Sequence, residues 1–159
     1  SALEVGRERA RREKGGFSYR HTTVALAGDE IAACLIGYLL DDPYDLTGLD
    51  DMPEPFRPLV RLEAKAPGTW YVNVIATFPE YRGQGIGARL LEIAGDRTRE
   101  AGAAASSIIV GSWNAGATRL YSRCGYQVVA QEPAILPEAY LQTGDWLLMT
   151  RSLTKRTSS

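Results

Sequence analysis

The chain is poor in the residues that mark several common kinds of protein. It has two cysteines, Cys34 and Cys124, whose spacing fits neither a disulfide framework nor a metal site, and its one histidine is His21. The formal net charge is only −1, which argues against general binding to nucleic acid or to an anionic membrane. The apolar runs are too short to span a bilayer, and no signal-peptide pattern is present. These absences predict a metal-free protein of a reducing, cytoplasmic compartment.

What the sequence does contain is enough apolar residues for one core. They make up 45% of 159 residues, so we expect one domain over 1–159. Periodicity and turn residues predict helices at 3–14, 86–101 and 114–124, and strands at 18–27, 31–40, 69–77, 107–110, 126–131 and 146–151. The strand at 31–40 is apolar throughout, which is typical of a strand covered on both faces. The order of the elements predicts a mixed α/β fold.

A long segment, 41–67, separates the second predicted strand from the third. It holds five of the eight prolines and reads as a loop with a short helix near 58–65. A loop of this length in a compact domain is usually functional or mobile.

The residues Tyr-Arg-Gly-Gln-Gly-Ile-Gly at 81–87 stand between a predicted strand and a predicted helix. Three glycines in five positions let the backbone approach a ligand and leave N–H groups free at the start of the helix. These N–H groups, the positive end of the helix dipole and the side chain of Arg82 suit a phosphate. The loop therefore predicts a cofactor that carries a diphosphate.

Two common nucleotide motifs fit this loop poorly. A P-loop needs Lys-Ser/Thr after the glycines, and none follows. A dinucleotide fingerprint can be placed on Gly83, Gly85 and Ala88, but the next strand ends at Asn114 without the acidic residue that would hold a ribose.

The segment 82–87 instead resembles the acyl-CoA loop Arg/Gln-x-x-Gly-x-Gly/Ala of the GNAT superfamily of N-acyltransferases. A second block, 114–126, resembles the family's Asn-x-x-Ala-x-x-Leu-Tyr-x-x-x-Gly-Phe/Tyr. The resemblance is clear over 68–130 and implies the GNAT acyl-CoA-binding fold, a mixed and mostly antiparallel sheet flanked by helices. The family fold begins with a strand and a helix that have no counterpart here, so we expect the native N-terminus to precede Ser1.

The resemblance implies acetyl-CoA as the cofactor and assigns residues to it. The backbone of Ile75, Ala76 and Thr77 would contact the pantetheine arm, on an edge that the next strand leaves unpaired. The pyrophosphate would lie on Arg82, Gly83, Gln84, Gly85, Ile86 and Gly87. Asn114, Ala117 and Tyr121 would complete the cofactor site from the following helix. Asn114 also suits a helix N-cap, and Tyr121 also suits a core position, so each has a structural alternative.

Acyl transfer to an amine needs a base for the amine and a proton for the departing thiolate. The resemblance implies that Tyr121 supplies that proton. For the base we expect Glu63 or a chain of waters, with Asn73 orienting the acceptor or a water. His21 and Tyr71 are weaker candidates.

The expected acceptor is a primary amine of a small molecule or peptide, and a homodimer is compatible with the resemblance. We expect the acceptor pocket to form from the first helices, the 41–67 loop and the 132–145 loop. The 41–67 loop is acidic and would suit a cationic acceptor, although the acids can also serve only to solvate it. Its acids are Asp41, Asp42, Asp45, Asp50, Asp51 and Glu54. Two alternatives to an enzyme stay open: an acyl-CoA sensor without turnover, and a nucleotide-binding domain of another kind.

Overall fold

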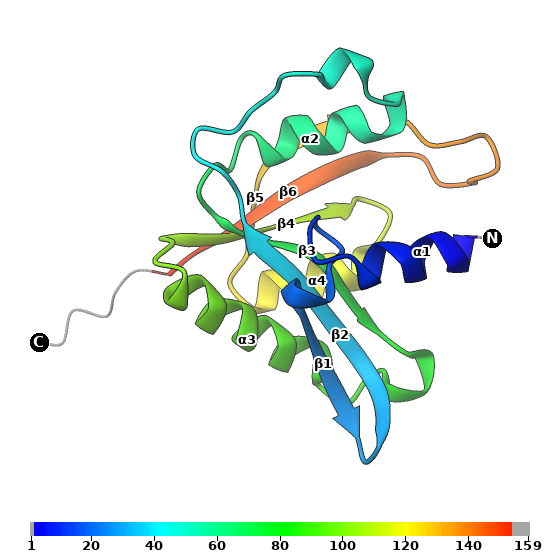
Figure 1. The fold of residues 1–159 in the computed structure, drawn as a ribbon, viewed down its shortest axis with the longest axis vertical. Helices are drawn as coiled ribbons and strands as arrows, with labels where there is room; N and C mark the ends of the chain where they lie inside the picture. Colours follow the sequence, from blue (N-terminus) through cyan, green and yellow to red (C-terminus); the bar gives the residue numbers. More distant parts are fainter. Residues whose placement is uncertain (1, 154–159) are drawn as a thin grey trace, which may run out of the picture.

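A six-stranded sheet forms the centre of the computed structural model, which describes residues 2–153 (Figure 1). The strands are β1 (Thr22–Ala27), β2 (Glu30–Leu39), β3 (Trp70–Thr77), β4 (Ala105–Gly111), β5 (Gln127–Pro133) and β6 (Asp145–Ser152). They lie in the order β1-β2-β3-β4-β6-β5, and every neighbouring pair is antiparallel except β3 and β4. The predicted fold class, a mostly antiparallel sheet flanked by helices, is confirmed.

The helices lie close to their predicted positions. They are α1 (Ala2–Arg11), α2 (Arg57–Glu63), α3 (Ile86–Glu100) and α4 (Ala115–Arg123). Short 3₁₀ turns are η1 (Tyr19–His21), η2 (Leu49–Asp51), η3 (Glu54–Phe56) and η4 (Pro79–Tyr81). The first strand begins at Thr22 and not at Ser18, because the Ser18 hydroxyl caps η1 by accepting from the backbone N–H of Arg20 at 3.3 Å.

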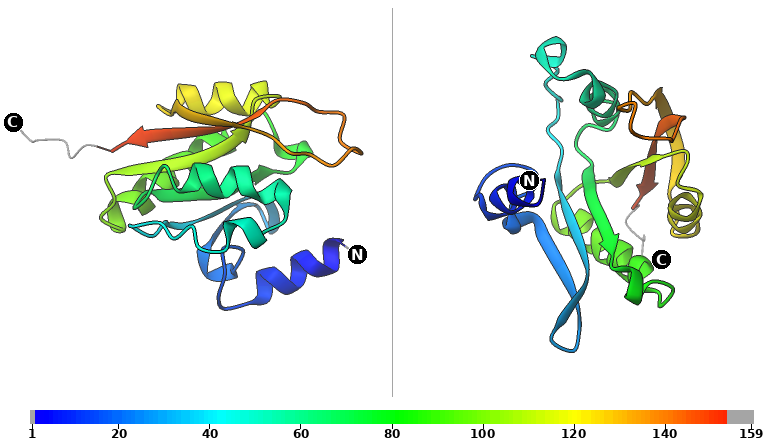
Figure 2. Two further views of the ribbon diagram at one scale, coloured as in Figure 1. Left: turned by 90° about the horizontal axis from the view of Figure 1, so that it is seen from above. Right: turned by 90° about the vertical axis from the view of Figure 1, so that its right-hand side faces the viewer.

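The sheet carries helices on both faces, as Figure 2 shows. Helix α3 packs against β2, β3 and β4, whereas α2 packs against β5 and β6. Each face of the sheet has its own hydrophobic core, as two consecutive residues of β6 show. Met149 belongs to the main core with α3, and Leu148 belongs to a second core with Leu62 of α2. Period-two alternation along the strand places the two side chains on opposite faces. None of the described helices is long and apolar enough to cross a membrane.

The expectation that β2 is covered on both faces is wrong in part. Ala33 and Leu35 are fully buried against α3, but Cys34 and Ile36, which alternate with them along the strand, are only half-buried. The helix α2 lies over the far end of the sheet, on β5 and β6, and so it leaves this face of β2 partly open.

Asn73 is an extra residue in the ladder between β2 and β3. Val72 pairs with Gly37 and Val74 pairs with Ile36, so no residue of β2 stands opposite Asn73. Such a β-bulge reverses which face the following side chains occupy. Ile75 consequently lies on the α3 face and packs against the main core.

The bulge comes where β3 also parts from β4. The two strands pair only at Trp70, Tyr71 and Val72, with Ser106, Ser107 and Ile108 as partners. Beyond these residues β4 continues to pair with β6 as far as Gly111. The backbone of β3 from Val74 to Thr77 is therefore paired on the β2 side alone. This confirms the prediction that the next strand leaves this edge of β3 unpaired.

The fold depends on a close approach at Gly37, whose missing side chain makes room for an indole. A Cβ at Gly37 would lie 2.2 Å from the Trp70 ring. We expect Gly37→Ala to lower the free energy of unfolding by about 1–3 kcal/mol, the usual cost of overpacking. The measurement is urea unfolding followed by circular dichroism.

Gly116→Ala serves as the control, because Gly116 lies in α4 and a Cβ there meets nothing within 4 Å. That variant should be unchanged or stabilised by up to about 1 kcal/mol, as alanine favours helix. Equal stability of the two variants would contradict the packing assigned to Trp70.

Candidate active site

The separation of β3 from β4 opens a cavity of about 360 Å³ between the two strands. Side chains and backbone from both strands line it, and so does α4. Four of the predicted site residues meet here: Asn73, Ile75, Asn114 and Tyr121. We call this cavity the strand cleft. Trp113 and Trp146 also line it, with ring centroids 4.9 Å apart in an edge-to-face arrangement.

The glycine loop leads from β3 into α3 in a conformation that requires glycine. Gly83 and Gly85 have φ angles of 75° and 79°, in the left-handed region that other residues rarely adopt. Gly85 is the N-cap of α3, and no side chain caps the helix there. The first N–H groups of α3 are therefore available to a ligand.

A second cavity, of about 460 Å³, lies over this loop and the start of α3. We call it the loop cavity. The predicted residues that line it are Thr77, Arg82, Gly83, Gly85, Ile86 and Gly87. Gln84, Ala76 and Ala117 do not line it, and Ala76 lies exposed on the opposite face of β3 from Thr77.

Arg82 has a structural role beside its charge. Its Nε donates to the carbonyl oxygen of Thr77 at 3.3 Å, which ties the glycine loop to the end of β3. Arg82 therefore has a structural reason to be in the loop in addition to the contact with a phosphate that the sequence predicts.

Tyr121 projects from α4 into the main core and reaches the strand cleft. Only 7% of it is exposed, and its ring centroid lies 6.3 Å from that of Tyr126. Burial raises the pKa of Tyr121 to about 12, so its hydroxyl keeps its proton at neutral pH. Tyr121 therefore packs in the core and also lines the strand cleft, so the structure agrees with both of the positions that the sequence allowed.

Asn114 caps α4, as the sequence predicts. Its side-chain oxygen accepts from the backbone N–H of Ala117 at 3.2 Å. The same residue lines the strand cleft, so the cap does not exclude a contact with a ligand.

Glu63 does not line the strand cleft but lies in a neighbouring cavity of about 580 Å³. Burial raises the pKa of its carboxyl group, although hydrogen bonds from Tyr44 and Tyr71 act in the opposite direction. The cavity takes residues from the first segment and from the 41–67 segment, as expected for an acceptor pocket. It takes none from the 132–145 loop, whose side chains at Tyr140 and Leu141 are exposed.

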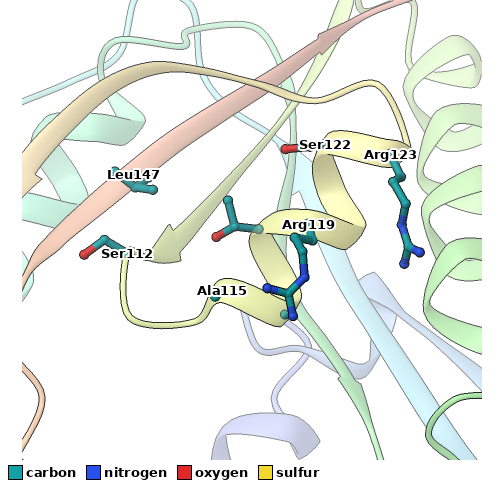
Figure 3. A pocket seen from close by; sticks show the side chains of 8 residues that line it. Ser112, Ala115, Arg119, Ser122, Arg123 and Leu147 are labelled. Atoms are coloured by element: carbon teal, nitrogen blue, oxygen red, sulfur yellow. The ribbon is translucent and has the colours of Figure 1, made fainter.

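Sequence reasoning missed two cationic residues of α4, Arg119 and Arg123. Arg123 lines the loop cavity, and both line an adjoining cavity of about 770 Å³ (Figure 3). Figure 3 shows both guanidinium groups extending from α4 away from Leu147. Their spacing of four residues puts them on one helix face, which the periodicity of α4 could have indicated. Among residues 2–153, no group of three or more His, Cys, Asp or Glu side chains is arranged to hold a metal ion.

Comparison with solved structures agrees with this geometry. The IAA acetyltransferase from Bacillus cereus ATCC 14579 has a TM-score of 0.59 and 17% identity, and the alignment covers 83% of this chain and 77% of that one. A GNAT family acetyltransferase from Elizabethkingia anophelis with acetyl-CoA bound has a TM-score of 0.57 and 20% identity, covering 83% and 75%. The ribosomal-protein-S18-alanine N-acetyltransferase from Escherichia coli has a TM-score of 0.60 and 20% identity, covering 87% and 73%.

At these identities the structural matches establish the fold. No curated protein sequence matches the chain. The sequence model of the acetyltransferase (GNAT) family matches residues 3–126, which is most of the chain and includes the glycine loop and α4. The predicted resemblance is therefore confirmed, and this protein belongs to the GNAT family of acetyltransferases.

Proposed function

We propose that this protein is an N-acetyltransferase that moves an acetyl group from acetyl-CoA to a primary amine of a small molecule or peptide. The amine attacks directly, while both substrates are bound. The observation that carries the proposal is the strand cleft, in which an unpaired strand edge and a buried tyrosine hydroxyl lie next to a phosphate-binding loop.

The residues of the loop cavity and the strand cleft fit acetyl-CoA, the cofactor of this family. The diphosphate finds free N–H groups at the start of α3, and a Cβ at Gly83 or Gly85 would meet nothing within 4 Å, so the loop surface is open. Arg82 and Arg123 line the same cavity and add positive charge. The solved structure from Elizabethkingia anophelis, which has the same fold, holds acetyl-CoA. The unpaired backbone of β3 offers hydrogen bonds to the amide groups of a pantetheine arm.

Within the cleft each group of the chain has a distinct task. Acetyl-CoA supplies the acetyl group as a thioester. Tyr121 holds its proton at neutral pH and donates it toward the departing sulfur. Asn73 orients the acceptor or a water from the bulge of β3. Holding both reactants in place supplies much of the rate.

The loop assignment predicts the effect of Gly85→Glu. The added carboxylate would face the phosphates, and like charges in contact cost several kcal/mol. We expect CoA affinity, measured by calorimetric titration, to fall by roughly a hundredfold or more, with NAD as a ligand that should not bind either protein.

The matched control is Gly102→Glu, at the far end of α3. Gly102 has a φ of 71°, close to the 79° of Gly85, and a Cβ at either position meets nothing within 4 Å. Both variants therefore carry similar backbone strain, and Gly102→Glu should bind CoA normally. Unchanged affinity in a folded Gly85→Glu protein would overturn the loop assignment.

The role of Tyr121 predicts a loss of turnover without a loss of binding. Tyr121→Phe removes the proton donor but keeps the ring, so we expect kcat to fall about 10²-fold or more while the Kd for CoA stays the same. Tyr126→Phe is the control, because Tyr126 lies in the same core with its hydroxyl bonded to Ser106 at 2.5 Å and does not line the cleft.

The alternative of an acyl-CoA sensor meets the same test. A wild-type chain that binds acetyl-CoA but acetylates no amine in a broad panel would favour the sensor. Equal turnover by wild type and Tyr121→Phe would remove Tyr121 from the chemistry.

The two roles of Asn114 can be separated by two substitutions. Asn114→Ala removes the cap of α4 and should lower the free energy of unfolding by about 1 kcal/mol. Asn114→Asp keeps a capping oxygen and should keep that stability, but its negative charge faces the cofactor and should weaken CoA binding. Thermal unfolding and CoA titration measure the two effects. Normal CoA affinity in both variants would leave Asn114 a cap alone.

A further inference from the structure

The cavity that contains Glu63 joins aromatic and acidic side chains from three parts of the chain. We call it the tyrosine pocket. It lies between the end of α2, the end of β2 and the segment before β1, and its volume is about 580 Å³. Its polar and aromatic lining consists of His21, Tyr38, Asp41, Tyr44, Asp45 and Glu63. Among the described residues, no lysine or arginine lines it.

Glu63 is a half-buried carboxylate with no cationic partner in the part of the chain that the structure describes. The hydroxyl of Tyr44 donates to its Oε2 at 2.5 Å, and Tyr71 also hydrogen-bonds to it. Within residues 2–153 no lysine or arginine forms an ion pair with Glu63. A carboxylate removed from water without a positive partner costs free energy, so this position favours a ligand that brings the positive charge.

The walls around Glu63 also suit a cation. The ring of Tyr38 lies 5.5 Å from that of His21 and 5.9 Å from that of Tyr71, measured between centroids. Aromatic faces attract an ammonium group. Burial, together with the negative charge of Glu63, raises the pKa of Tyr38 to about 12, and the pKa values of Tyr44 and Tyr71 are raised as well. These phenols therefore stay neutral and do not compete with Glu63 for charge.

A second negative region stands at the mouth of the pocket. Asp41 and Asp45 line it and are exposed, in contrast to Glu63. Hydrogen bonds with Thr47 lower the pKa of Asp45, which keeps it ionised over the neutral range. The pocket thus offers one site for positive charge in its depth and another at its mouth.

The tyrosine pocket adjoins the strand cleft through Asn73. The side-chain Nδ2 of Asn73 donates to the carbonyl oxygen of Gly16 at 3.4 Å. Gly16 lines the tyrosine pocket and Asn73 lines the strand cleft. The two cavities are therefore neighbours that meet at the hydrogen bond between Asn73 and Gly16.

Building on the proposed function, we infer that the tyrosine pocket is the acceptor site and that its substrate is an aliphatic diamine bound as a dication. One ammonium lies among Glu63, Tyr38 and Tyr44, and the other lies at Asp41 and Asp45. Glu63 takes a proton from the inner ammonium. The freed nitrogen forms a bond to the thioester carbonyl carbon, and the carbon–sulfur bond breaks with its electron pair on sulfur. Tyr121 supplies a proton to that sulfur, and the second proton that the nitrogen loses as the amide forms restores the Tyr121 hydroxyl. Glu63 returns its own proton to solvent.

Binding tests this inference without turnover. The probe is 1,5-diaminopentane, titrated calorimetrically into the full chain with CoA present. We expect binding that weakens at least tenfold in Glu63→Gln and at least threefold in the double variant Asp41→Asn, Asp45→Asn. As a control, Glu132→Gln should bind normally, since Glu132 is also largely covered but pairs with Lys65 outside the pocket. Replacing the second amine with a carboxylate, as in 5-aminopentanoate, should abolish measurable binding.

The pH profile separates proton transfer from simple charge attraction. The groups that face Glu63 are Tyr38, Tyr44 and Tyr71, with His21, Asp41 and Asp45 around the same cavity. Because burial raises the pKa of Glu63, the base is present above that pKa and is lost as pH falls, so wild-type kcat/KM should decline on the acid side, and at a higher pH than an ordinary glutamate would give. Glu63→Gln needs the free amine, so its rate should be low at neutral pH and rise toward pH about 10.

Each result bears on one of the two proposals. Equal affinity of wild type and folded Glu63→Gln for 1,5-diaminopentane, or no affinity at all, would overturn the acceptor site. If the wild type still binds CoA and acetylates other amines in that case, the N-acetyltransferase proposal stands and only the substrate class is wrong. If the chain acetylates no amine of any class, the proposed function itself fails.

Discussion

The site depends on one feature of the backbone, the parting of β3 from β4 after three paired residues. The backbone N–H and C=O groups of a strand inside a sheet normally hydrogen-bond to the neighbouring strand. Unpaired groups at a strand edge cost free energy when they are buried, and they can pair with another chain when they are exposed. Here β4 follows β6 while β3 follows β2, and the Asn73 bulge bends β3 at the same place. The result is a set of unpaired backbone groups held rigidly on both sides, ready to bind an extended ligand.

The opening also connects two surroundings of opposite charge. On the side of α3 and α4, Arg82, Arg123 and the first N–H groups of α3 suit an anionic cofactor. Beyond Asn73, the tyrosine pocket has a half-buried carboxylate and two exposed aspartates, which suit a cation. In the proposed function, the amine acceptor and the phosphate-bearing donor are each attracted to a different region, with the cleft between them. The arrangement favours a complex that holds both substrates over one in which they compete for one site.

Several residues of the site also stabilise the fold, which explains why sequence reasoning found it hard to choose between roles. Tyr121 packs in the core and reaches the cleft, Asn114 caps α4 and lines the cleft, and Arg82 ties the glycine loop to Thr77. Such residues need experiments that read stability and binding separately. The paired substitutions at Asn114 do this, because one of them keeps the cap and changes only the charge.

The sequence by itself determined the local elements and the family, since both rest on patterns a few residues long: the glycines of 81–87, the block at 114–126 and the periodicity of the helices. It also placed the unpaired edge of β3 through the family resemblance. Only the tertiary structure decided that Asn73 is a bulge, that Ala76 faces away from Thr77, that Arg123 joins the loop cavity, and that Glu63 lies among three tyrosines. These facts depend on register between strands and on contacts between residues far apart in the chain. Neither is encoded in a local pattern, because both follow from how the whole set of elements packs.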